Sequence, residues 1–169
     1  MTVAADPDTI VEGPPTGLVF SHVSVPCRDI VQGKRFYTEV LGGTVRIDTP
    51  EFVGLQVFGT DIGIGSIGTS FLGHDSEYPH VAFFASADAM LQMKAWLTRC
   101  GVPSSNFWTR NGVEALMFFR DPSGNLIELF CERGFTGAET LPHGPARGHG
   151  TAVDITLLYY RDWRTPTGH

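Results

Sequence analysis

The segment Arg120–Phe130, with the sequence RDPSGNLIELF, decides how the rest of the chain is interpreted. A turn of Asp, Pro, Ser and Gly leads into the apolar run Leu126–Cys131, which predicts a β-strand. Side chains alternate along a strand, so Glu128 shares its face with Leu126 and Phe130. An ionised carboxylate between apolar neighbours is costly unless a positive group pairs with it. The segment therefore predicts a partner for Glu128 elsewhere in the chain.

The composition is that of a folded globular protein. The chain has 169 residues, of which 42% are hydrophobic and 18% are charged, enough for one well-packed domain or two small fused modules. Its net charge of −6 provides no basic patch for nucleic acid or for anionic membranes. No apolar run is long enough to span a bilayer. We therefore expect neither nucleic acid nor a membrane as a partner.

The cysteines and the first residues indicate a cytoplasmic protein. Cys27, Cys100 and Cys131 are odd in number, far apart and set in apolar surroundings. This pattern is typical of reduced, buried thiols. The start of the chain has neither a basic region nor an apolar region of a secretion signal. Residues 1–16 have little periodicity and are expected to form a flexible lead-in.

The next part of the chain predicts one strand, one helix and three further strands. A strand is expected within Val19–Val25, with His22 on the face opposite the valines. Asp29 and Gln32 resemble a capping box at the start of a helix that ends at Gly42 and Gly43. Three extended runs follow, at 44–48, 52–58 and 62–67.

The same order of elements then repeats. A strand that begins near His80 is followed by a helix capped by Ser86 and closed by Gly101, and then by extended runs at 103–109, 114–119 and 126–131. The closing glycines Gly42 and Gly101 lie 20 and 21 residues after His22 and His80. We predict an α+β domain, residues 17–133, made of two tandem βαβββ modules (about 17–70 and 78–133) that form a curved mixed sheet around a metal-binding cavity.

The remaining residues, 134–169, form a C-terminal extension. A Gly/Pro-rich connector precedes the apolar segment TAVDITLLYYRDW, residues 151–163. A solvated tail would not need so many large apolar side chains. We expect this segment to form one further strand, or an arm that docks onto the core or onto a second subunit.

Three residues could hold a metal ion. If the two modules pack pseudo-symmetrically, His22 and His80 come from equivalent strands and meet Glu128 in the cavity. Two imidazoles and one carboxylate can form a facial triad that leaves positions for substrate. The alternatives are histidines that simply belong to the core and a Glu128 that pairs with Arg46, Arg110 or Arg120.

The sequence resembles the vicinal oxygen chelate superfamily, which includes glyoxalase I, extradiol dioxygenases, fosfomycin-resistance transferases and bleomycin-binding proteins. The resemblance is carried by SHVSVPCRDIVQGKRFYTEVLGG, PHVAFF and RDPSGNLIELF, and it covers about residues 18–133. It implies paired βαβββ modules and places His22, His80 and Glu128 at the metal-ligand positions. The strand at 61–66 has no carboxylate at the position of the fourth glyoxalase I ligand.

Among the activities of the family, the three-ligand pattern favours a dioxygenase that acts on a small aromatic diol. The metal is expected to be Fe(II), with Mn(II), Ni(II) or Zn(II) as alternatives. Acid/base candidates are Tyr37 and Tyr78. A glyoxalase-like lyase or isomerase, a fosfomycin-type transferase and a small-molecule binding protein are the alternative functions.

A homodimer is expected because paired-module proteins of this size commonly complete their cavities across a two-fold axis. The aromatic lining of the substrate pocket is predicted to consist of Phe20, Phe84, Trp108, Phe118 and Phe130.

Overall fold

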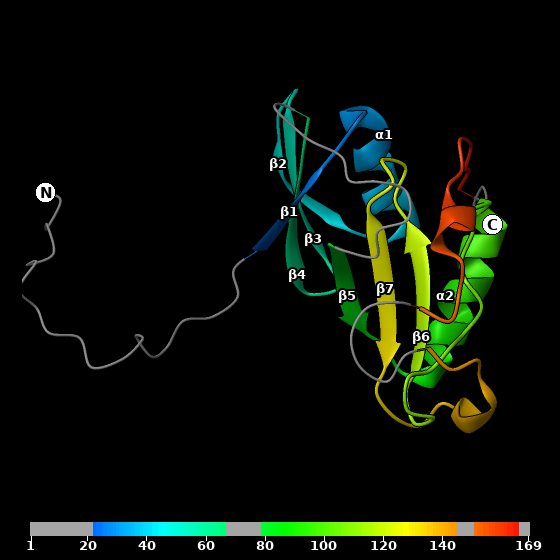
Figure 1. The fold of residues 1–169 in the computed structure, drawn as a ribbon. Coiled ribbons are helices and arrows are strands. Elements are labelled where there is room, and N and C mark those ends of the chain that lie inside the picture. Colours follow the sequence, from blue (N-terminus) through cyan, green and yellow to red (C-terminus); the bar gives the residue numbers. More distant parts are fainter. Residues whose placement is uncertain (1–21, 67–78, 145–150, 166–169) are drawn as a thin grey trace, which may run out of the picture.

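The computed structural model of the chain describes residues 22–66, 79–144 and 151–165 (Figure 1). In this part of the chain two small sheets lie beside each other, and one helical segment is packed on each of them. The α+β class is confirmed, and the predicted helices and strands occur in the expected order except for the strand expected at 103–109. Within the described ranges, no helix has the length and apolar character needed to cross a membrane.

The first module forms sheet A. Its strands are β1 (His22–Pro26), β2 (Thr44–Asp48), β3 (Phe52–Val57) and β4 (Thr60–Gly65), in the order β1-β4-β3-β2, with β1 parallel to β4. Asp29 caps the helix α1 (Ile30–Arg35) by accepting a hydrogen bond from the backbone N–H of Gln32 at 3.0 Å. The helix continues into one π-helical turn, η1 (Phe36–Val40). These helical residues pack on the face of sheet A that carries Val53, Leu55, Ile62 and Ile64.

The second module forms sheet B. Its strands are β5 (His80–Phe84), β6 (Ala115–Arg120) and β7 (Leu126–Cys131), in the order β5-β7-β6, with β5 parallel to β7. Helix α2 (Ala87–Cys100) begins at the Ser86 cap and ends at Gly101, which has a positive φ of 72°. It packs on the face of sheet B that carries Met117, Phe119, Ile127 and Leu129.

The run at 103–109 differs from the expected strand. It makes only isolated bridges to β6, between Ser104 and Phe119 and between Trp108 and Leu116. Pro103 lacks a backbone N–H, and the side chain of Ser105 accepts the N–H of Phe118 at 2.9 Å. The hydroxyl of Ser105 thus takes the place of a backbone carbonyl as the acceptor for Phe118. The segment therefore runs along β6 without forming a regular strand.

The turn of the RDPSGN segment joins the two modules. The hydroxyl of Ser123 accepts the backbone N–H of Arg28 at 2.9 Å, and the amide of Asn125 donates to the carbonyl of Pro26 at 2.7 Å. The hydroxyl of Tyr37 donates to the carboxylate of Asp121 at 3.2 Å. The segment that indicated the fold therefore also forms a hydrogen-bonded contact between the two modules.

The C-terminal extension docks on its own core. The predicted further strand is instead a short 3₁₀-helix, η3 (Ile155–Leu158), and a second one, η2 (Ala138–Thr140), lies in the connector. Ile155 and Leu158 are buried against Trp108, Leu116 and Phe118, on the face of sheet B opposite α2. We call this face, which carries His80, Glu128, Phe84, Phe118, Phe130 and their neighbours, the helix-free face of sheet B. The extension covers its β6 side.

Candidate metal centre

Glu128 is placed where the alternation of the strand predicted, on the helix-free face of sheet B. It lies in the middle of β7 and pairs in register with Ala82 on β5 and Phe118 on β6. Only 6% of its surface is exposed. Its Oε2 atom lies 3.2 Å from Nε2 of His80. The structure therefore brings together two of the three predicted ligands.

Phe118 holds the ring of His80 in place. The two rings meet edge to face, with centroids 5.7 Å apart, and Phe118 also contacts Trp108 at 5.8 Å. Phe118 and Trp108 are fully buried beneath the extension. Phe118 therefore packs beside His80, Trp108 packs on Phe118, and neither ring is an open wall of a pocket.

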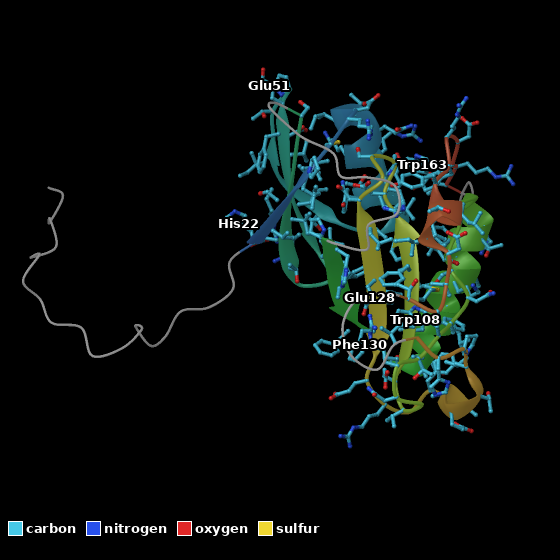
Figure 2. All side chains as sticks on the ribbon, in the orientation of Figure 1. His22, Glu51, Trp108, Glu128, Phe130 and Trp163 are labelled. Atoms are coloured by element: carbon cyan, nitrogen blue, oxygen red, sulfur yellow. The ribbon has the colours of Figure 1, made fainter. Side chains whose placement is uncertain are left out.

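His22 lies on the other sheet. Figure 2 shows it at one end of β1, apart from Glu128 and Phe130 on β7. Within residues 22–66, 79–144 and 151–165, no three His, Cys, Asp or Glu side chains are close enough together to hold a metal ion. The triad of His22, His80 and Glu128 is thus not assembled within one chain, and it stays a prediction.

The arginines that were the alternative partners of Glu128 have other contacts. Arg46 donates to the side chain of Gln56 at 2.7 Å, and Arg110 stacks over Trp108 at 4.7 Å. Arg120 donates to the carbonyl of Gly124 at 2.6 Å and stacks over Tyr159 at 4.2 Å. Each guanidinium is thus engaged with a neighbour other than the carboxylate of Glu128.

The remaining predicted site residues do not all lie near the His80–Glu128 pair. Phe84 is 83% exposed on the helix-free face of sheet B and contacts the partly buried Phe130, with ring centroids 5.7 Å apart. Tyr37 is buried on the helix side of sheet A, away from His80 and Glu128. Burial and the neighbouring Asp121 carboxylate raise the pKa of Tyr37 well above its usual value. Phe20 and Tyr78 lie outside the described residues.

A cavity lies on the helix-free face of sheet A, which we define as the side that carries His22, Phe52, Gly54, Gln56, Asp61 and Gly63. Its volume is about 270 Å³, and His22, Arg46, Phe52 and Asp61 are among the residues that line it. Neither Asp61 as a site residue nor Arg46 as part of a pocket was predicted from the sequence. The alternation of β3 and β4 could have indicated Asp61, but the position of Arg46 depends on a strand irregularity that the sequence does not reveal.

The pair on sheet B fits a divalent cation. Ligand bonds of about 2.1 Å at adjacent octahedral positions separate the two donor atoms by about 3 Å, close to the 3.2 Å between His80 and Glu128. A cation could lie between these two atoms and be bound by both. A third donor would have to come from outside this pair, and His22 is the predicted one.

Comparison with protein families identifies the class to which this architecture belongs. The sequence pattern of the Glyoxalase/Bleomycin resistance protein/Dioxygenase superfamily matches residues 19–129, so the chain belongs to this superfamily. The resemblance of the sequence to this superfamily is thereby confirmed. No curated protein sequence matches the chain significantly.

Solved structures with the same fold include proteins of different activities. The fosfomycin resistance protein FosX of Listeria monocytogenes is 20% identical, with a TM-score of 0.60 over 70% of this chain and 94% of that chain. Lactoylglutathione lyase of Agrobacterium tumefaciens is 17% identical, with a TM-score of 0.57 over 70% and 95%. A glyoxylase/bleomycin resistance protein/dioxygenase domain of Frankia sp. EAN1pec is 23% identical, with a TM-score of 0.59 over 70% and 94%. At these identities the likeness concerns the fold.

Proposed function

We propose that this chain is a metal-dependent enzyme that binds a small, oxygen-chelating substrate, with His22, His80 and Glu128 as the metal ligands. The observation that carries the proposal is the pair formed by the partly buried His80 and the buried Glu128, whose side chains lie 3.2 Å apart on the helix-free face of sheet B. A cation between these two groups would offset the cost of burying the carboxylate of Glu128. A structure of FosX contains Mn(II), which supports a divalent metal in this fold.

The chain itself would hold and shield the reacting molecule. His80 and Glu128 are fixed on neighbouring rigid strands, and the buried Phe118 restricts the ring of His80. Phe84 and Phe130 offer an apolar surface beside them on which a planar substrate could lie. A cation bound there would supply Lewis acidity toward two neighbouring substrate oxygens, and Fe(II) would also supply the redox chemistry for an oxygen-dependent reaction.

The reaction that we favour is oxygen-dependent cleavage or oxidation of a small aromatic diol. Its support is the pair of phenylalanines beside the candidate ligands. The competing reaction class is that of a lyase, isomerase or fosfomycin-modifying enzyme, which would use the same ligands without oxygen. Its support is the likeness of the fold to FosX and lactoylglutathione lyase.

Metal analysis and oxygen consumption test this proposal together. We expect about one metal ion per chain in the purified protein and a large loss of it in Glu128→Ala, because a facial triad with one ligand removed binds weakly. The exposed Glu132 provides a matched control, and Glu132→Ala should keep its metal. An oxygen electrode then follows the Fe(II)-loaded protein with a panel of diols.

Two outcomes would contradict the proposal at different levels. Equal, low metal content in the wild type and in Glu128→Ala would remove the metal site altogether. Turnover of an identified substrate without oxygen, at the full aerobic rate, would leave the metal site intact but replace the dioxygenase with the lyase or isomerase class.

A further inference from the structure

The cavity on the helix-free face of sheet A holds a positive charge that the proposed metal site does not use. The regular pairing of β2 with β3 is interrupted between Val45 and Ile47, so Arg46 lies in a β-bulge. Bulges redirect side chains, and both Arg46 and the following Ile47 line the same cavity. The guanidinium is held there by a 2.7 Å hydrogen bond to Oε1 of Gln56.

A polar row leads from this guanidinium to His22. Gln56 on β3 pairs in register with Asp61 on β4, and Asp61 pairs in register with His22 on β1. Paired residues in adjacent strands point to the same face, so Gln56, Asp61 and His22 lie in line across three strands. The bond from Arg46 to Gln56 extends the row to β2.

The rest of the cavity suits a flat apolar group. The ring of Phe52 lies so close to Gly63 that a Cβ atom there would come within 2.7 Å of two ring carbons. Gly54 lies opposite Gly63 in the pairing of β3 with β4. The ring of Phe52 covers Gly63 and the side chain of Ile47 covers Gly54, so these two apolar side chains form walls of the cavity.

We propose that this cavity binds the carboxylate of a small aromatic hydroxy acid, with Arg46 as the residue that selects the acid. The guanidinium of Arg46 uses one N–H group for its hydrogen bond to Gln56. Its remaining N–H groups can donate two parallel hydrogen bonds to a carboxylate, and the positive charge strengthens both. The carboxylate of Asp61, at the other end of the row, would repel an anion but accept a hydrogen bond from a substrate hydroxyl. The two charges therefore orient the molecule with its acid at Arg46 and its hydroxyl toward His22.

This inference rests on the proposed function in one respect, because it names the substrate class of the same enzyme. Unlike the proposed function, it does not require a bound metal, because the acid would bind through Arg46 with or without one. Binding can accordingly be measured without turnover.

The test compares an acid with its neutral amide. Calorimetric titrations of the purified protein would use 3,4-dihydroxybenzoate and 3,4-dihydroxybenzamide, which differ in charge but hardly in shape. We expect the acid to bind about tenfold or more tightly than the amide, and Arg46→Gln to abolish this preference while leaving amide binding unchanged. Arg46→Lys should restore part of it, because a point charge replaces the planar group. Arg133→Gln, an exposed arginine outside the cavity, is the matched control.

Either of two results would overturn the inference. One is equal affinity of the wild type for the acid and the amide, and the other is an undiminished preference for the acid in Arg46→Gln. The metal content of the wild type and of Glu128→Ala, measured in the test of the proposed function, separates failure of this inference from failure of that proposal. Loss of the acid preference only in Arg46→Gln, with metal content independent of Glu128, would retain the acid site and reject the metal site.

Discussion

Asp121 combines a structural role with a perturbed protonation equilibrium. Its Oδ1 atom accepts the backbone N–H groups of Ser123 and Asn125 at 2.9 and 2.8 Å, and Oδ2 accepts the side chains of Asn125 and Tyr37. Burial nevertheless raises the pKa of Asp121 from 3.8 to about 6, against the effect of these hydrogen bonds. At neutral pH the contact between the modules therefore contains a costly buried charge.

The raised pKa of Asp121 predicts that part of the stability is lost between about pH 4 and pH 6. A carboxyl that binds its proton more tightly in the folded state stabilises that state fully below its unfolded pKa, and this contribution disappears as the pH rises through the folded pKa. A shift from 3.8 to about 6 corresponds to roughly 3 kcal/mol. Asp121→Asn cannot titrate, and its amide N–H would face the amide of Asn125. We expect the variant to be less stable than the wild type near pH 4, with a gap that narrows toward pH 7.

Urea unfolding at a series of pH values measures this gap. The exposed Asp162 provides a control for the loss of one carboxylate, as Asp162→Asn. A difference between the wild type and Asp121→Asn that stays constant from pH 4 to pH 7 would show that Asp121 does not titrate in this range.

At the scale of elements, the C-terminal extension completes the core of the second module. The buried Arg120 donates to the carbonyl of Ile155 at 3.4 Å, and the hydroxyl of Tyr160 donates to the carbonyl of Arg120 at 2.9 Å. Further along, Trp163 meets Phe36 of the first module edge to face, at 5.9 Å. The extension, which lies beyond the matched family segment, thus contacts both modules.

Two adjacent leucines of η3 allow the docking of the extension to be tested. Leu158 is 3% exposed and packs against Trp108 and Phe118, whereas Leu157 is 72% exposed. Leu158→Ala should lower the free energy of unfolding by about 2–4 kcal/mol, since it leaves a cavity in a packed cluster. Leu157→Ala should change it by less than about 0.5 kcal/mol. Equal effects of the two substitutions in urea unfolding would mean that the extension is not docked in solution.

The elements were predictable to the extent that local patterns determine them. The alternation in 126–131 placed Glu128 on the correct face, and the caps at Asp29 and Ser86 marked both helices. The extension was expected to dock, but the pattern could not distinguish a strand from a 3₁₀-helix in so short an apolar run. The irregular edge at 103–109 depends on a hydrogen bond between Ser105 and Phe118, which only the tertiary structure reveals.

At the scale of the whole molecule, the separation of the predicted ligands has a physical explanation that the sequence could not provide. Pseudo-symmetry predicted that His22 and His80 occupy equivalent strands, and they begin β1 and β5. It did not determine how the two sheets face each other, because that depends on packing between modules. His22 and the His80–Glu128 pair lie on the helix-free faces of different sheets, so a second copy of the chain could place one face against the other.

A homodimer in which each metal site is shared between subunits predicts complementation between two defective variants. His22→Ala and Glu128→Ala each lack one ligand, so neither should bind metal alone. In a mixed dimer with shared sites, one site has lost both ligands and the other is complete. After full exchange of subunits, half of the dimers are mixed, and metal content should recover to about one quarter of the wild-type value. If each site lay within one chain, every site in a mixed dimer would still lack a ligand, and no metal would return. Metal analysis after mixing, with light scattering to establish the dimer, distinguishes the two arrangements, and a strictly monomeric mass at micromolar concentration would exclude the shared site.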